Sequence, residues 1–137
     1  MRFEELMAGL SERAGFDGGL AADAEGAVRV VIDGFDVAFM EIPETERLVM
    51  WCNLGEMPLD DDGVLAARML RENFVRRGRE VLSRDEAGHA FAHRYVSLAA
   101  FGPDDFIDGP LEEFLDLLPR WAGLARGEDV QEVDGHE

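Results

Sequence analysis

The 137-residue chain contains no lysine and only one cysteine. A single cysteine, Cys52, cannot form a disulfide within the chain, and its apolar neighbours indicate a buried strand thiol with nothing nearby to activate it. No apolar run approaches the roughly 18 residues that a membrane span needs. The first residues lack a basic region followed by an apolar run, so we expect no signal peptide and a soluble, cytoplasmic protein.

Basic residues are scarce as well. Thirty acidic residues face thirteen arginines, which gives a formal net charge of −17 for one chain and twice that for a dimer. A field of this sign repels nucleic-acid phosphates and anionic lipids, so neither is an expected partner. One group of arginines could form a patch for a phosphate or an acidic partner, although compensation of a helix dipole and of nearby acids is the favoured interpretation. These arginines are residues 68, 71, 76, 77, 79 and 84.

Apolar residues make up 47% of the sequence, which is normal for a globular protein and too many for a disordered one. The length suits one ordinary domain, and neither a repeat nor a linker interrupts it. We therefore expect a single domain over residues 1–126. Residues 127–137 are acidic and weakly apolar, which predicts a disordered tail.

The first half of the chain predicts one helix and three strands. Apolar residues at three- and four-residue spacing predict a helix over residues 2–14. A β-branched run after Gly26 predicts a strand, and Asp33-Gly34 suits a two-residue hairpin turn. Pro43 marks the next turn. The three strands form a predicted antiparallel meander over residues 28–32, 36–42 and 47–54.

The second half predicts a helix, a hairpin and a last helix. Three acids at residues 60–62 offer a helix N-cap, and Gly78 follows the end of that helix. Pro110 suits the first turn of the last helix, and Pro119 should kink that helix or split it. The hairpin strands are predicted over residues 79–84 and 89–98. The order α-β-β-β-α-β-β-α predicts an α+β domain whose twisted antiparallel sheet has about five strands.

The sequence offers little for catalysis or metal binding, and we expect no cofactor. His89 and His93 supply two possible zinc ligands, but two ligands do not make a site, and their pattern is typical of a strand. The acids at 60–62 lack the spacing and the distal glutamate of a calcium loop. None of the three serines lies in a strained, glycine-flanked turn, and the glycines form no phosphate loop.

Apolar residues exceed what one face of the predicted sheet can bury. If Leu48, Met50 and Cys52 face the core, then Val49 and Trp51 face outward. Exposed apolar patches usually mark interfaces, and the alternative is that a second helix or a dimer mate covers them. The residues that we predict to bind a partner are Val31, Met40, Ile42, Val49 and Trp51.

Short segments along nearly the whole chain share one family pattern. They are Phe3 to Leu10, Gly15-Phe16 with Leu20, Asp23 to Gly26, Ile32 to Gly34, Leu48 to Met50, Leu54-Gly55, Leu65 to Leu70, Asn73-Phe74, Gly78, Val81-Leu82, Phe114 to Leu118 and Trp121. In their order, spacing and acidic balance they resemble the class I chaperones of type III secretion, the Tir-chaperone (CesT-type) family. Pro119 and the Ser83-Arg84-Asp85 turn depart from that pattern.

The resemblance implies a cytoplasmic homodimer that binds the N-terminal segment of a secreted effector and keeps it soluble, without a cofactor. It places the second helix and the fourth strand near the two-fold axis. The dimer residues that it implies are Leu65, Met69, Leu70, Asn73 and Val81. Two other functions stay open: a regulatory module of the same fold that binds a folded partner, and a small metal-dependent enzyme built on His89 and His93.

Overall fold

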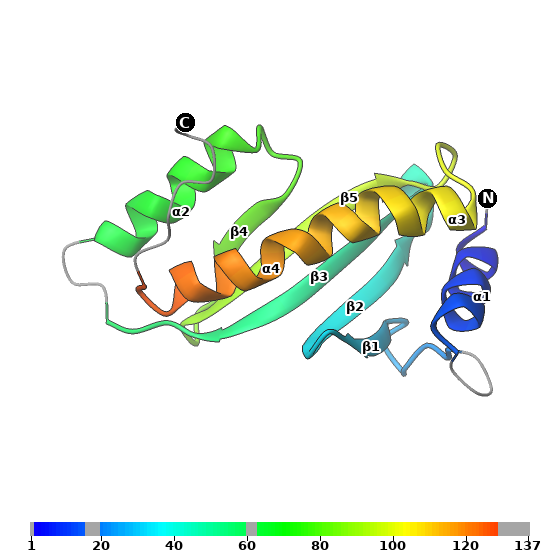
Figure 1. Cartoon of the computed structure of the whole chain (residues 1–137), viewed down its shortest axis with the longest axis horizontal. Coiled ribbons are helices and arrows are strands. Elements are labelled where there is room, and N and C mark those ends of the chain that lie inside the picture. The colour runs from blue at the N-terminus through cyan, green and yellow to red at the C-terminus, as the bar shows by residue number, and fades with distance from the viewer. Residues whose placement is uncertain (1, 16–19, 60–62, 129–137) are drawn as a thin grey trace.

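The computed structural model describes residues 2–15, 20–59 and 63–128 (Figure 1). It confirms the α+β class and the predicted five-stranded antiparallel sheet, whose strand order is β1-β2-β3-β5-β4. The elements are α1 (Phe3–Ala14), β1 (Val28–Ile32), β2 (Phe35–Ile42), the 3-10 turn η1 (Pro43–Thr45), β3 (Arg47–Glu56), α2 (Val64–Val75), β4 (Val81–Arg84), β5 (His89–Ser97), α3 (Pro103–Phe106), the π-helical segment η2 (Ile107–Leu111) and α4 (Glu112–Ala125).

The hairpin between β1 and β2 has the predicted two-residue turn. Asp33 and Gly34 both have positive φ, 54° and 85°, as a type I′ turn requires. The turn sets the register, in which Val30 pairs with Val37 and Val28 with Phe39. Because side chains alternate along a strand, this register places all four of these residues on the same face of the sheet.

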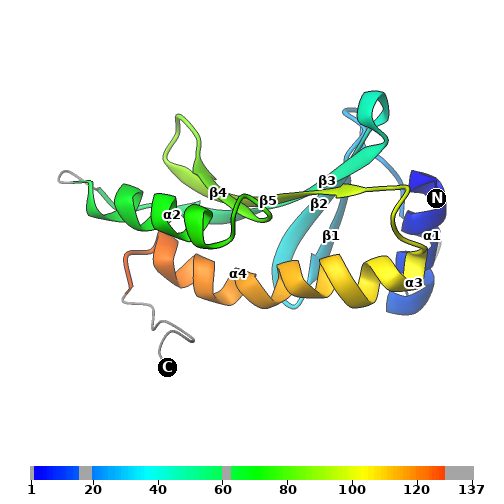
Figure 2. The same cartoon turned by 90° about the horizontal axis from the view of Figure 1, so that it is seen from above.

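One helix covers that face. Figure 2 shows α4 running along one side of the sheet, with α1 and α2 near its two ends. Phe114, Leu118 and Trp121 of α4 are completely buried, and they belong to the same core cluster as the strand residues Phe39 and Met50. The predicted alternation therefore holds, with Leu48, Met50 and Cys52 in the core.

The C-terminal helical region differs from the prediction at its start, and Pro119 does not split it. It begins at Pro103, and Pro110 lies inside the π-helical segment η2 instead of in a first turn. A wider turn accommodates a residue that has no N–H and whose ring crowds the carbonyl four residues back. Pro119 does not split α4, which runs on to Ala125. Because Pro119 is exposed, the carbonyl that it leaves without a partner can bind water.

Two predictions fall outside the described residues. The helix α2 starts at Val64, after Gly63 at φ 74°, and the three aspartates expected to cap it are not among the described residues. The same holds for residues 129–137 of the predicted acidic tail.

A charged cluster fixes α2 and β4 to the rest of the domain. Glu80, just before β4, is completely buried. Arg76 Nε and Arg94 Nη1 each donate to a Glu80 carboxylate oxygen at 2.8 Å, and Arg79 Nε donates at 3.1 Å. Arg94 also donates to Glu113 of α4 at 2.8 Å. One buried carboxylate thus joins the end of α2 to β5 and α4, and it engages two of the clustered arginines.

The Glu80→Gln substitution tests this cluster. It removes the charge but nearly keeps the shape, which leaves the buried Arg94 and its neighbours undercompensated. We expect a loss of about 3 kcal/mol in the free energy of unfolding, measured by urea denaturation. Glu4→Gln, which breaks an ion pair with Arg2 on the exposed surface of α1, is the matched control and should leave stability unchanged. Equal effects of the two substitutions would contradict this role of Glu80.

Candidate functional site

The second face of the sheet has no helical cover within the described chain (Figure 2). The register brings the five predicted partner-binding residues onto this face: Met40 pairs with Val49, and the pairs Ala38–Trp51 and Arg29–Ala38 continue the next row. We call this surface the open face. The alternative of a second covering helix is therefore wrong for the described residues. The strand residues of the open face include Val31, Met40, Ile42, Val49, Trp51, Phe91, His93 and Tyr95.

The open face has a hollow of about 320 Å³. Trp51 pairs with His93 across β3 and β5, and Val49 pairs with Tyr95 in the next row. The rings of His93 and Tyr95 meet edge to face with centroids 6.0 Å apart. We call this the aromatic hollow, and its lining residues are Val49, Trp51, Asp85, Phe91, His93 and Tyr95.

Two arginines lie on the aromatic rings of this face. The Arg29 guanidinium carbon is 5.7 Å from the Trp51 ring centroid, and that of Arg47 is 4.6 Å from the Tyr95 centroid. Both distances suit cation–π attraction. Arg29 also reaches Asp23 at 3.5 Å, whereas Arg47 Nε donates to the Thr45 hydroxyl at 3.1 Å. The open face is therefore apolar and aromatic, with guanidinium groups over its rings.

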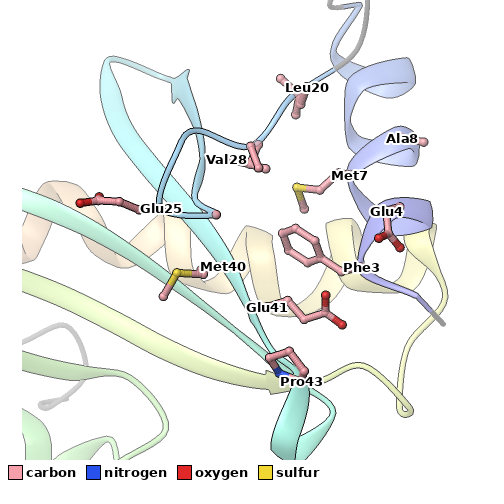
Figure 3. A pocket seen from close by; sticks show the side chains of 12 residues that line it. Phe3, Glu4, Met7, Ala8, Leu20, Glu25, Val28, Met40, Glu41 and Pro43 are labelled. Atoms are coloured by element: carbon pink, nitrogen blue, oxygen red, sulfur yellow. The ribbon is translucent and has the colours of Figure 1, made fainter.

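A second cavity, which the sequence did not reveal, lies between α1 and the β1–β2 end of the sheet (Figure 3). Its volume is about 520 Å³. Figure 3 shows Phe3 and Met7 of α1 on one side, facing the strand residue Val28. We call it the α1 groove. It is lined by Phe3, Glu4, Met7, Ala8, Leu20, Ala22, Glu25, Gly26, Val28, Met40, Glu41 and Pro43.

The α1 groove adjoins a stretch of β2 that β1 does not pair. Pairing between the two strands stops at Val28 and Phe39, so residues 40–42 continue beyond β1. Met7 and Met40 both line the groove, and methionine side chains adapt to ligands of irregular shape. Such an edge beside an apolar groove can accept an extended segment through main-chain hydrogen bonds.

The residues predicted for a dimer interface separate into two groups. Leu65 and Met69 are buried in the core of the chain itself, and Asn73 binds β4, because its Nδ2 donates to the Leu82 carbonyl at 3.0 Å. Val81 is half-buried at the start of β4. Only Leu70 is well exposed, at 69% of its surface.

Other apolar residues of α2 join Leu70 on the outside. Phe74, one turn further along α2, is 83% exposed, and Val75 is 61% exposed. We call Leu70, Phe74 and Val75 the α2 patch. Exposed phenylalanine and leucine side chains one helical turn apart form a ready contact surface for another helix. Of the residues predicted for a dimer interface, Leu65 and Met69 lie on the inward side of α2 and Leu70 on its outward side.

The described residues give little support for catalysis. Burial, with a smaller contribution from Asp36, raises the pKa of the Cys52 thiol to about 11, so the thiol stays protonated near neutral pH. No group of three His, Cys, Asp or Glu side chains in the described part of the chain could hold a metal ion. His89 Nδ1 lies 3.3 Å from Asn53 Nδ2 on the open face. None of the described helices is long and apolar enough to cross a membrane.

Comparison with known proteins finds one family. Residues 5–122 match the model of the Tir chaperone protein (CesT) family. No curated protein sequence matches the chain. Three similar solved structures share its fold at low identity. They are a chain of the ExsC–ExsE complex (20% identity, TM-score 0.74, 92% of this chain and 98% of that chain), one of the HopA1–SchA chaperone–effector complex (20%, 0.64, 89% and 91%) and one of the Yersinia pestis chaperone SycH with a YscM2 fragment (17%, 0.69, 90% and 99%).

The pH dependence of stability tests the burial of His93. Burial lowers the pKa of His93 below its ordinary 6.5. The stability that comes from keeping His93 neutral is therefore complete above the pKa that this residue has in the unfolded chain. It is lost as the pH falls through the lower pKa of His93 in the folded chain. Between about pH 7 and about pH 5, the wild type should lose more unfolding free energy than His93→Gln, which does not titrate there. Urea denaturation at each pH measures the difference, and identical pH profiles would contradict it.

Proposed function

Because the chain belongs to the Tir chaperone protein (CesT) family, we propose that it is a type III secretion chaperone. It binds the N-terminal segment of a secreted effector in the cytoplasm and keeps that segment soluble and competent for secretion. The observation that carries the proposal is the sheet's uncovered second face, with the α1 groove at one end of the domain. It acts as a binding protein, not as an enzyme.

The two surfaces suit an extended ligand better than a folded one. The α1 groove adjoins unpaired strand backbone, and the aromatic hollow accepts single bulky side chains. A flexible segment that becomes ordered on binding loses several kcal/mol of favourable free energy, which a long apolar contact offsets. The HopA1–SchA structure is described as a chaperone–effector complex, which agrees with a ligand of this kind.

We further propose that the protein is a homodimer held by the α2 patch. Leu70 and Phe74 are 69% and 83% exposed and lie one helical turn apart, and a second copy packed on α2 would bury both. A net charge of −17 on each chain opposes association, so the apolar contact must outweigh that repulsion. A two-fold axis beside α2 leaves both α1 grooves free.

Effector capture is tested by co-expression with N-terminal segments of secreted proteins encoded in the same genome. We expect Trp51→Glu to abolish co-purification of a bound segment, because a carboxylate at the aromatic hollow is costly to bury, while the thermal unfolding curve stays unchanged. Leu59→Glu, at an exposed residue outside both surfaces, is the matched control. Capture that survives Trp51→Glu would contradict the proposal. So would a folded partner that no flexible N-terminal segment displaces, because it would indicate a regulatory module.

Light scattering coupled to size-exclusion chromatography tests the dimer. The wild type should have the mass of two chains, and the double substitution Leu70→Glu with Phe74→Glu should have the mass of one. The reason is that the double substitution places four carboxylates, two from each chain, in one symmetric contact. Val31→Glu, at an exposed residue of the open face, should remain dimeric. A monomeric wild type would contradict the proposal.

A further inference from the structure

The α1 groove has acidic residues on its wall and, among the described residues, no arginine. Its three acids are Glu4, Glu25 and Glu41. Glu4 has an ion pair with Arg2 at 3.5 Å, whereas Glu41 makes no ion pair within the described chain. Figure 3 shows the Glu41 side chain directed from β2 toward α1, while Glu25 points away from that helix. Glu41 therefore gives the groove a charge without a counter-ion.

The backbone of Glu41 also lacks a partner on the side of the groove. The two residues that flank a two-residue hairpin turn exchange both main-chain hydrogen bonds, and bonded pairs then alternate with non-bonded pairs. The flanking pair here is Ile32 with Phe35, so the last bonded pair of β1 and β2 is Val28 with Phe39. Two residues further along β2, Glu41 directs its N–H and C=O to the same side, where β1 has ended.

An added strand has only a short stretch of β2 to pair with. Val28 fills the place opposite Phe39, and Pro43, which has no N–H, begins the 3-10 turn η1. Residues 40–42 remain, and the first and last of them turn their main-chain groups toward β3. Main-chain hydrogen bonds to Glu41 thus position one ligand residue, and side-chain contacts must supply the rest of the affinity and the selectivity.

The register decides which ligand side chain meets the Glu41 carboxylate. Residues that pair directly across two antiparallel strands have their side chains on the same face, with Cβ atoms about 4.5–5.5 Å apart. Glu41 shares its face with Phe39 and hence with Val28, because side chains alternate with period two. A ligand residue opposite Glu41 therefore lies on that face. So do its neighbours two positions away, on the side that the apolar groove residues Phe3 and Val28 line.

We propose that the α1 groove selects an extended segment with an arginine or lysine opposite Glu41 and an apolar residue two positions away. The segment exchanges main-chain hydrogen bonds with Glu41, its basic side chain pairs with the carboxylate, and its apolar side chain enters the groove. This inference rests on the proposed function and names the ligand chemistry of one of its surfaces. A net charge of −17 favours basic ligands everywhere, so the distinguishing feature is a preference that depends on Glu41 itself.

Three blocked pentapeptides serve as probes: Leu-Ala-Arg-Ala-Leu, its neutral form Leu-Ala-Gln-Ala-Leu, and its truncated form Ala-Ala-Arg-Ala-Ala. The first carries the proposed pattern in either chain direction. Binding is followed by NMR shifts of the methyl groups of Met7 and Met40, which both line the groove. At physiological salt, which screens distant charges, the arginine peptide should bind about two- to fivefold more tightly than the neutral one, as expected for one exposed ion pair. The truncated peptide should bind weakest of the three.

Substitutions on β2 and in η1 assign the preference. Glu41→Gln should abolish the advantage of the arginine peptide, and Glu41→Arg should reverse it in favour of Leu-Ala-Glu-Ala-Leu. Glu44→Gln is the matched control and should leave the advantage unchanged. It removes the same charge three residues away, from an exposed side chain that does not line the groove.

Three outcomes would overturn the inference. Equal effects of Glu41→Gln and Glu44→Gln would show that overall charge sets the preference. Absent shifts at Met7 and Met40 with every peptide would show that the groove is not a ligand site. Methyl shifts that depend on protein concentration alone would show that a second copy fills it. In each case the chaperone function stands if an effector segment co-purifies, whereas failure of every segment to co-purify, with the peptide preference intact, counts against the proposed function alone.

Discussion

The structure depends on one imbalance: a five-stranded sheet with two apolar faces has a helix layer for only one of them. The α4 helix covers the first face, and its residues Phe114, Leu118 and Trp121 are completely buried in the core. The second face keeps Trp51 and Tyr95 in contact with solvent, partly covered by arginine side chains. A sheet in this condition has apolar surface left for binding.

The ends of α4 determine where the other binding surfaces lie. At one end, Glu72 of α2 accepts hydrogen bonds from Arg120 and from the Trp121 indole, and the Glu80 cluster adds a second attachment. Leu65 and Met69 therefore turn inward, and the opposite side of α2 faces outward. At the other end, α1 packs on α3 so closely that a Cβ on Gly9 would lie 2.7 Å from Pro103 Cβ. That contact holds α1 beside the sheet and forms the α1 groove.

Strand periodicity made the open face predictable, because alternation with period two decides which side a residue faces once one core residue is known. The Asp33-Gly34 turn fixed the register in the same local way. The α1 groove was not predictable, since Phe3 and Met7 show ordinary helix periodicity and only the approach of α1 to β2 makes them line a cavity. The π-helical segment at Pro110 and the inward side of α2 likewise depend on packing between distant segments, which local patterns do not encode.

The absence of lysine has a physical counterpart in these contacts. At Glu80, guanidinium groups from three arginines donate to a single buried carboxylate, and at Tyr95 and Trp51 guanidinium groups lie over aromatic rings. A planar, weakly hydrated guanidinium forms both contacts well, whereas a compact, strongly hydrated ammonium loses more solvation and offers no plane to stack. The same chemistry that secures the α2 end of the domain therefore lets the open face carry positive charge while its rings remain available to an apolar ligand.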